Sequence, residues 1–318
     1  MSSTTLKLES EEAPCPICGS SARRLFWPFA SNVISNAADF LVAKCRDCSF
    51  WYLHPTPKLT PEVLTHLYNA NYFVHDPTNR GEWKDDLRHA KQDPNVLRWL
   101  SLLRSKKKTT GDKLLDIGCG RGVLIGVAQS LGWEVHGFDV TDTNRRLIFE
   151  NCGVEVRVGE RPTNHFEASS FDAIVCKDVL EHQSAPTDFL AELKDLLKPG
   201  GVIFLSFPNE DALMNKWIRC LRILRLSRTP PPTSMQPFQE PYHMIGFTER
   251  SFDFLTARLA LHKIWSERRW GTDVFSRRTY VVPTSFRGKV FERTLYWSAW
   301  LGDRLNNGLY FHTILTKT

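Results

Sequence analysis

The segment Leu114-Leu115-Asp116-Ile117-Gly118-Cys119-Gly120-Arg121-Gly122 decides the fold. It runs from a short apolar strand into a glycine-rich turn, and a helical pattern follows. Glycine in such a turn allows φ > 0 and lets a ligand approach the backbone closely. The Gly-x-Gly-x-Gly spacing and the carboxylate of Asp116 argue against a dinucleotide site, because that carboxylate would repel a pyrophosphate.

Short apolar runs alternate with helical segments on both sides of this turn. We expect strands over residues 113–117, 134–138, 155–158, 173–176 and 201–207. Such alternation predicts βαβ units and an α/β fold with a doubly wound, mostly parallel sheet. Asp139 ends the second of these strands, where a carboxylate can bind both hydroxyls of a ribose.

An Asp-x-Gly-x-Gly-x-Gly turn followed by an acid at the end of the next strand resembles the class I S-adenosylmethionine-dependent methyltransferases. Residues 171–182 (FDAIVCKDVLEH) look like that family's fourth strand and the turn after it. Residues 196–202 (LLKPGGV) and Pro208-Asn209 look like its entry to and exit from the fifth strand. The resemblance implies a Rossmann-like, seven-stranded sheet that binds S-adenosyl-L-methionine.

The resemblance also implies cofactor-binding roles by position. It assigns the methionyl part of the cofactor to Asp116, Gly118, Gly120, Gly122, Lys177 and Asp178, the ribose to Asp139 and the adenine to Glu160. The alternative for Glu160 is a solvated acid in a loop, and the alternative for the glycine turn is a packing turn without a ligand.

Two Cys-x-x-Cys pairs precede this region, Cys15-Pro16-Ile17-Cys18 and Cys45-Arg46-Asp47-Cys48. Four thiolates complete a tetrahedral zinc shell and leave no open position, so we expect structural Zn²⁺. Free or redox-active thiols are the alternative. The order of a zinc ribbon, a helical region and a methyltransferase domain resembles some methyltransferases that act on sugars and secondary metabolites.

The start of the chain, MSSTTLKLESEEAP, has no basic stretch followed by an apolar one, and no apolar run reaches the length of a membrane span. We therefore expect a cytoplasmic protein. The expected segments are a disordered tail (1–13), a zinc ribbon (14–58), a helical cap (59–108), a cofactor-binding core (109–210), a basic insertion or lid (211–246) and the C-terminal completion of the methyltransferase domain (247–318).

Methyl transfer to a hydroxyl or an acidic C–H benefits from a general base, and histidine titrates near neutral pH. The candidates are His182 after the fourth strand and His243 in the insertion, with Tyr242 orienting the acceptor. The alternatives are a fold-determined helix start for His182 and a hydrogen-bonded loop residue for His243. Asp178-x-x-Glu181-His182 also resembles a metal-binding arrangement in some ubiquinone-pathway O-methyltransferases, which leaves a catalytic metal as an alternative.

The insertion carries a basic amphipathic pattern over residues 214–228, with positive residues at Lys216, Arg219, Arg222, Arg225 and Arg228. A solvated surface helix, a lid over a phosphorylated or lipid-linked substrate, and a peripheral membrane contact all fit this pattern.

The function predicted from these motifs is methylation of a small polar acceptor, at a hydroxyl or carbon of a glycan, nucleotide sugar or secondary metabolite. A nucleic-acid methyltransferase that grips RNA with the ribbon is one alternative, although 35 acidic residues balance 41 basic ones and disfavour a continuous basic face. A catalytically silent cofactor-binding scaffold is another. The patterns leave O-, C- and N-methylation open, and they do not predict an oligomeric state.

Overall fold

A computed structural model describes residues 6–29, 34–67, 82–223, 243–269 and 286–317. The chain forms two compact units. The cysteine unit comprises Met1–Lys58, Phe207–Phe254 and Ser266–His312, and the sheet unit comprises Leu59–Ser206, Leu255–Trp265 and Thr313–Thr318. Within the described residues, no helix is long and apolar enough to cross a bilayer.

The sheet unit is built on seven strands in the order β12-β13-β10-β9-β6-β7-β8. Their bounds are β6 (Lys113–Ile117), β7 (Glu134–Asp139), β8 (Arg157–Val158), β9 (Phe171–Lys177), β10 (Leu197–Pro208), β12 (Leu261–Arg269) and β13 (Tyr310–Lys317). The pairs β10–β9, β9–β6, β6–β7 and β7–β8 are parallel. Thr316 in β13 donates a hydrogen bond to Gly201 in β10, and the mostly parallel sheet confirms the predicted fold class.

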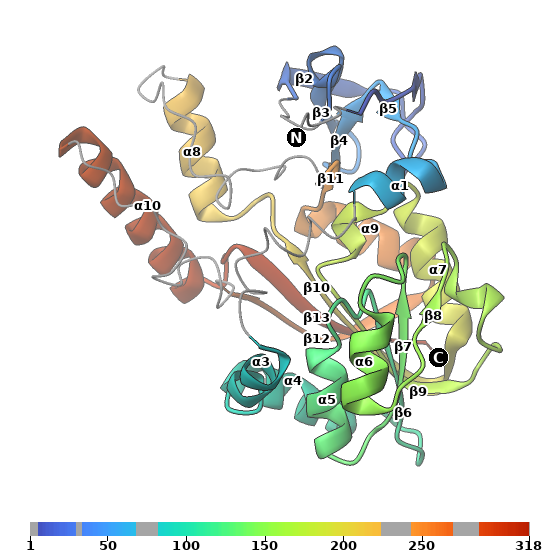
Figure 1. The fold of residues 1–318 in the computed structure, drawn as a ribbon. Helices are drawn as coiled ribbons and strands as arrows, with labels where there is room; N and C mark the ends of the chain where they lie inside the picture. Colours follow the sequence, from blue (N-terminus) through green and yellow to red (C-terminus); the bar gives the residue numbers. More distant parts are fainter. Residues whose placement is uncertain (1–5, 30–33, 68–81, 224–242, 270–285, 318) are drawn as a thin grey trace. The chain divides into compact units, whose positions relative to one another are not determined.

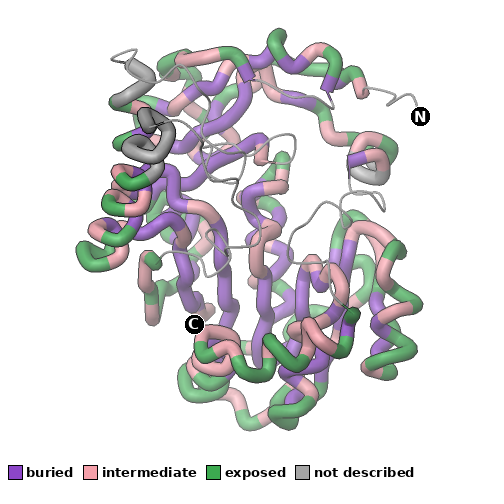
Figure 2. Tube along the Cα trace, turned by 60° about the vertical axis from the view of Figure 1, so that its left-hand side comes forward, coloured by how far each residue is buried: buried purple, intermediate pink, exposed green. Residues whose placement is uncertain are grey.

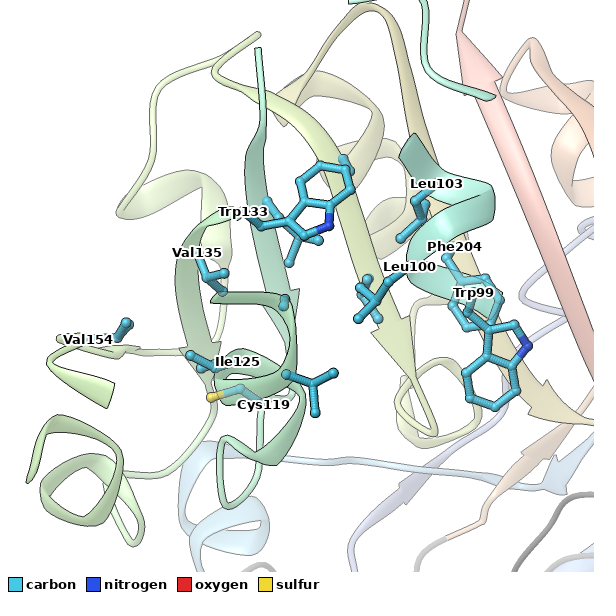
Figure 3. Close-up of a cluster of buried hydrophobic side chains, with 14 of the residues drawn as sticks. Trp99, Leu100, Leu103, Cys119, Ile125, Trp133, Val135, Val154 and Phe204 are labelled. Atoms are coloured by element: carbon cyan, nitrogen blue, oxygen red, sulfur yellow. The ribbon is translucent and has the colours of Figure 1, made fainter. Parts of the chain in front are cut away.

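Helices cover the sheet (Figure 1). They are α3 (Trp83–Ala90), α4 (Pro94–Lys106), α5 (Val123–Ser130), α6 (Arg145–Cys152), α7 (Pro186–Leu196) and α9 (Glu249–Arg258), with short helices η3 (Pro162–Asn164) and η4 (Leu180–His182). Helix α1 (Pro61–Leu67) precedes them in the chain. Apolar side chains of α4, α5 and α6 pack on one face of the strands, and Figure 3 shows Trp99 of α4 beside Phe204 of β10. The central strands β6, β9 and β10 are buried along most of their length (Figure 2). Leu115, Ile174 and Ile203, each next in sequence to a residue of this cluster, are also inaccessible.

The cysteine unit contains a four-stranded sheet in the order β11-β4-β3-β2, antiparallel throughout. Its elements are β1 (Ser10–Glu11), β2 (Arg23–Pro28), η1 (Ala37–Asp39), β3 (Leu41–Cys45), β4 (Trp51–His54), β5 (Thr56–Pro57), α8 (Leu213–Ile223), β11 (Ile245–Gly246) and α10 (Phe286–Arg304). Strand β11 comes from the end of the expected insertion, yet it extends the sheet of the ribbon through pairing with β4.

The structure differs from the expected disordered tail over residues 6–13. Strand β1 pairs with β5, and Leu8 is buried. The side-chain amide of Asn36 accepts a hydrogen bond from the Leu8 N–H at 2.9 Å and donates one to the Leu8 carbonyl at 3.0 Å. One apolar anchor and these backbone bonds order the segment despite its polar composition. Residues 1–5 lie outside the described part of the chain.

Candidate functional site

The strand register brings the predicted cofactor residues to one edge of the sheet. Asp116 lies opposite Val175, and Ile117 lies opposite both Phe138 and Cys176. The glycine turn, Asp139 and Lys177 therefore all follow the carboxyl ends of adjacent parallel strands. Ligands of open α/β sheets bind at this edge, where the strand order reverses.

The glycine turn has a backbone that only glycine adopts without strain. Gly118, Gly120 and Gly122 have φ angles of 66°, 50° and 72°. A Cβ atom on Gly118 would lie 2.3 Å from Val179 Cγ2, and one on Gly122 would lie 2.6 Å from Ile148 Cγ1. The turn is thus packed too closely on its neighbours to accept side chains, which leaves its backbone N–H groups close to the sheet edge.

Asp139 organises this turn from the next strand. Its carboxylate accepts hydrogen bonds from the backbone N–H of Gly120 at 3.0 Å and of Thr141 at 3.2 Å. Burial raises its pKa, while these amide donors lower it. Each carboxylate oxygen has a second lone pair, so the group can accept further donors such as ribose hydroxyls.

Asp116 is a buried acid with only 4% of its surface exposed. Burial, and then the negative charge of Asp139, raise the pKa of Asp116 to about 8, and the positive charge of Lys177 only partly offsets them. A buried carboxylate of this kind is stabilised by a cation placed next to it. S-adenosyl-L-methionine carries both an ammonium and a sulfonium, and the donor set therefore fits this cofactor.

The remaining residues predicted to bind the cofactor are Glu160, Lys177 and Asp178. Gly159 donates a backbone hydrogen bond to the Asp139 carbonyl at 3.1 Å, and the exposed Glu160 is the next residue in the chain. Lys177 pairs with the carboxylate of Asp178, whose φ of 56° is unusual for a residue other than glycine. Such backbone strain is typical of functional turns.

The four cysteines of the ribbon meet within the cysteine unit. Their sulfur atoms lie within 4.8 Å of one another, with Cys15–Cys48 and Cys18–Cys45 Sγ distances of 3.5 Å. A zinc tetrahedron with Zn–S bonds of ~2.3 Å has sulfur–sulfur edges of about 3.8 Å. A hydrogen bond from Cys48 lowers the pKa of Cys15 to about 6, which favours a thiolate at neutral pH.

Comparisons with known proteins agree with this geometry. A family model described as a methyltransferase domain matches residues 87–240. The ubiquinone biosynthesis O-methyltransferase of Paraburkholderia phymatum is 33% identical, over 40% of this chain and 61% of its own. That of Dinoroseobacter shibae is 35% identical, over 34% of this chain and 46% of its own. The chain thus spans about half the length of these curated relatives.

A crystal structure of a SAM dependent methyltransferase from Archaeoglobus fulgidus has the same fold. It superposes with a TM-score of 0.50 at 15% identity, and covers 77% of this chain and 99% of that chain. Residues 87–240 thus match a methyltransferase domain, and the sheet has the fold of a SAM dependent methyltransferase. The family match falls on the residues that build the glycine turn, Asp139 and Lys177, which were expected to bind the cofactor.

Sequence reasoning missed a clamp on the glycine turn of the methyltransferase domain. Helix α3 provides Trp83, whose indole N–H donates to the Arg121 carbonyl at 2.8 Å, and Asp86, which pairs with the Arg121 guanidinium at 2.5 Å. Both partners of this ion pair are largely buried. Residues 82–90 had an expected role only as part of a helical cap, because spacing in sequence carries no signal for a contact with Arg121.

The Asp86→Ala variant is expected to bind S-adenosyl-L-methionine about fivefold more weakly, since it releases Arg121 and loosens the turn. Calorimetric titration measures the change. Asp85→Ala is the matched control, because the Asp85–Arg88 pair is exposed and contributes little. An unchanged affinity in Asp86→Ala would show that the clamp does not shape the site.

The acidity of Asp116 predicts a pH dependence of stability. Its pKa rises from an ordinary 3.8 to about 8 on folding, so the folded state keeps a proton that the unfolded state has lost. The stabilising contribution of the neutral acid is complete below about pH 4 and is lost as the pH rises through about 8. Without cofactor, Asp116→Asn should therefore gain thermal stability over the wild type as the pH rises from about 5 to 8. If the melting temperatures of Asp116→Asn and the wild type differ by the same amount at both pH values, the raised pKa of Asp116 is contradicted.

The two histidines predicted as catalytic bases belong to different units. His182 is partly buried in η4, next to Glu181, whose pKa is raised by burial. His243 belongs to the cysteine unit and precedes Met244, whose carbonyl accepts a hydrogen bond from the Leu53 N–H at 3.2 Å. Tyr242 lies outside the described residues, as do Arg225 and Arg228, and the side chain of Arg222 is not described.

Proposed function

We propose that this chain transfers a methyl group from S-adenosyl-L-methionine to a hydroxyl of a small polar acceptor. The observation that carries the proposal is the pair of buried acids, Asp116 and Asp139, on either side of a glycine turn at the carboxyl edge of the sheet. The likeness to ubiquinone biosynthesis O-methyltransferases favours oxygen as the accepting atom.

The bound cofactor supplies an activated sulfonium methyl group, so the work of the protein is binding and alignment. Asp139 would hold the ribose hydroxyls and Asp116 would face the ammonium. Backbone groups of residues 118–122 would enclose the methionyl chain between them. Glu160, two residues beyond the β8 partner of Asp139, would lie near the adenine.

A histidine would remove the proton of the acceptor hydroxyl. His182 follows β9, next to Lys177 and Asp178 in the chain, which places it at the cofactor edge of the sheet unit. His243 is the second candidate. General-base catalysis contributes ~10²–10⁴-fold to the rate. We expect one of His182→Gln and His243→Gln to lose about 100-fold or more in kcat while cofactor affinity stays within about twofold.

We further propose that the four cysteines bind a structural Zn²⁺ and that the acceptor is a glycan, a nucleotide sugar or a secondary metabolite made in the cytoplasm. The support for zinc is that the four sulfur atoms lie within 4.8 Å of one another. The support for the acceptor class is the order of ribbon and methyltransferase domain.

The test is transfer of an isotope-labelled methyl group from S-adenosyl-L-methionine to panels of sugars, nucleotide sugars, phenolic metabolites and RNA. We expect label in a small-molecule panel, as an ether that survives mild alkali. Label in RNA alone would support a nucleic-acid methyltransferase. A protein that binds the cofactor and labels none of the panels would indicate a silent scaffold.

A further inference from the structure

Helix α10 has two faces of opposite character. Leu295 and Ala299 are buried, and they pack with Met214 and Ile218 of α8. The two helices lie side by side within the cysteine unit (Figure 1). The opposite face of α10 is exposed, and it carries large apolar side chains that a solvated helix does not need.

These exposed residues form one stripe along the helix. Arg293, Trp297, Trp300 and Arg304 follow one another at steps of four, three and four residues, which places them on one helical face. Trp297 is 67% exposed and Trp300 is 45% exposed. We call these four residues the tryptophan stripe. Each end of the stripe carries a positive charge, and its centre carries two indoles.

Two ring contacts fix the relative positions of side chains within the stripe. The two indole rings lie 5.7 Å apart, and the Arg304 guanidinium lies 4.3 Å from the centre of the Trp300 ring. Such a cation–π contact places the guanidinium over the face of the indole, so the charge and the ring form one compact group. Both groups can therefore meet a ligand surface together.

Helix α8 widens this surface. Trp217 is 39% exposed, and its indole N–H donates to Thr294 Oγ1 of α10 at 3.3 Å. Leu305, at 64% exposure, extends the apolar surface past the end of α10. The charged groups of the stripe, Arg293 and Arg304, are both positive.

We propose that the tryptophan stripe docks on an anionic phospholipid surface. Indole rings are amphipathic, and they are enriched at the boundary between headgroups and acyl chains. Lysine and arginine next to them attract anionic headgroups. Two indoles on one convex helix offer far less area than the ~800 Å² per partner of a stable protein interface. A bilayer needs no complementary shape, so a stripe of this size is sufficient for it.

The attachment is peripheral and reversible. The side chains that would enter the boundary are Trp297, Trp300 and Leu305, while Arg293 and Arg304 stay with the headgroups. Salt screens the charged part of this attraction and leaves the apolar part. Binding should therefore need anionic lipid, weaken with salt, and depend on the indoles at every salt concentration.

The test is sedimentation of the full, zinc-replete chain with phosphatidylcholine vesicles that contain or lack phosphatidylglycerol. We expect binding to the anionic vesicles, and a loss of about tenfold in apparent affinity in Trp297→Ser/Trp300→Ser. Arg293→Gln/Arg304→Gln should lose about tenfold on anionic vesicles and show less dependence on salt. Phe149→Ser is the matched control, since Phe149 is an aromatic residue that is 58% exposed on α6.

Each variant is first shown to bind S-adenosyl-L-methionine with wild-type affinity and to retain wild-type hydrogen exchange over β2–β4 and α8, which establishes that both units fold. The proposal is overturned if the wild type does not bind anionic vesicles or if the double tryptophan variant binds them like the wild type. It is also overturned if Phe149→Ser loses as much affinity for the vesicles as the double tryptophan variant. Sedimentation velocity tests the alternative that a second copy of the chain covers this face of α10. A wild-type dimer that Trp297→Ser/Trp300→Ser converts to a monomer would assign the stripe to a second copy of the chain and also overturn the proposal.

Discussion

Asp139→Ala is expected to weaken S-adenosyl-L-methionine binding by about 100-fold or more. The carboxylate would bind two ribose hydroxyls, and hydrogen bonds to a charged group contribute ~1.5–3 kcal/mol each. It also accepts hydrogen bonds from Gly120 at 3.0 Å and Thr141 at 3.2 Å, so its removal releases the turn as well. Both effects act in the same direction, and ~1.4 kcal/mol corresponds to tenfold in affinity.

Calorimetric titration of the Asp139→Ala variant measures this loss. The matched control is Asp142→Ala, because Asp142 is an exposed acid three positions further along the chain. We expect the control to retain affinity within about twofold, since exposed charges contribute little. Adenosine is a second probe, as it keeps the ribose and lacks the methionyl chain. If Asp139 holds the ribose, adenosine should lose its affinity in Asp139→Ala as well.

Loss of the metal is expected to unfold the ribbon. Cys15, Cys45 and Cys48 are almost inaccessible, and Ile17 and Phe50 are buried close to them in the chain. Structural zinc sites contribute ~10–16 kcal/mol to the folding of small modules. Strands β2, β3 and β4 are short, and the four cysteines would join the two Cys-x-x-Cys turns beside them through the metal. Cys45→Ser should therefore release zinc and expose the backbone of residues 15–54.

Hydrogen exchange followed by mass spectrometry locates this unfolding, and metal analysis gives the zinc content. We expect one zinc per wild-type chain and fast exchange over β2–β4 in Cys45→Ser or after chelation. Strands β6, β7 and β9 should keep their protection, because they belong to the sheet unit. Cys220→Ser is the control, since Cys220 is exposed on α8. A chelated chain with unchanged exchange over the ribbon would contradict a structural metal.

The core of the methyltransferase fold was predictable because its signals are local. The strand predicted over 113–117 is β6, residue for residue, since a glycine turn ends it and the preceding run is apolar. The two Cys-x-x-Cys spacings are also local signals, and they predicted the cluster of four sulfur atoms. Strand β8 is shorter than the expected 155–158, because only Arg157 and Val158 pair with β7.

The parts that sequence could not predict depend on contacts between distant residues. Strand β11 has two residues, and it forms only because Ile245 and Gly246 pair with Tyr52 and Trp51. The clamp on Arg121 comes from α3, whose pattern of charged residues is that of any surface helix. The ordering of residues 6–13 likewise depends on the side chain of Asn36, which no local pattern connects to Leu8.

Titration of the zinc-replete wild-type chain with S-adenosyl-L-methionine, in competition with NAD⁺, tests the central claim most directly. The buried acids at the sheet edge predict one cofactor bound per chain. Above about pH 8, where Asp116 is ionised, they also predict no displacement by the dinucleotide, whose pyrophosphate the Asp116 carboxylate would repel. A folded chain that binds no S-adenosyl-L-methionine, or that exchanges it for NAD⁺, would contradict the assignment of this site.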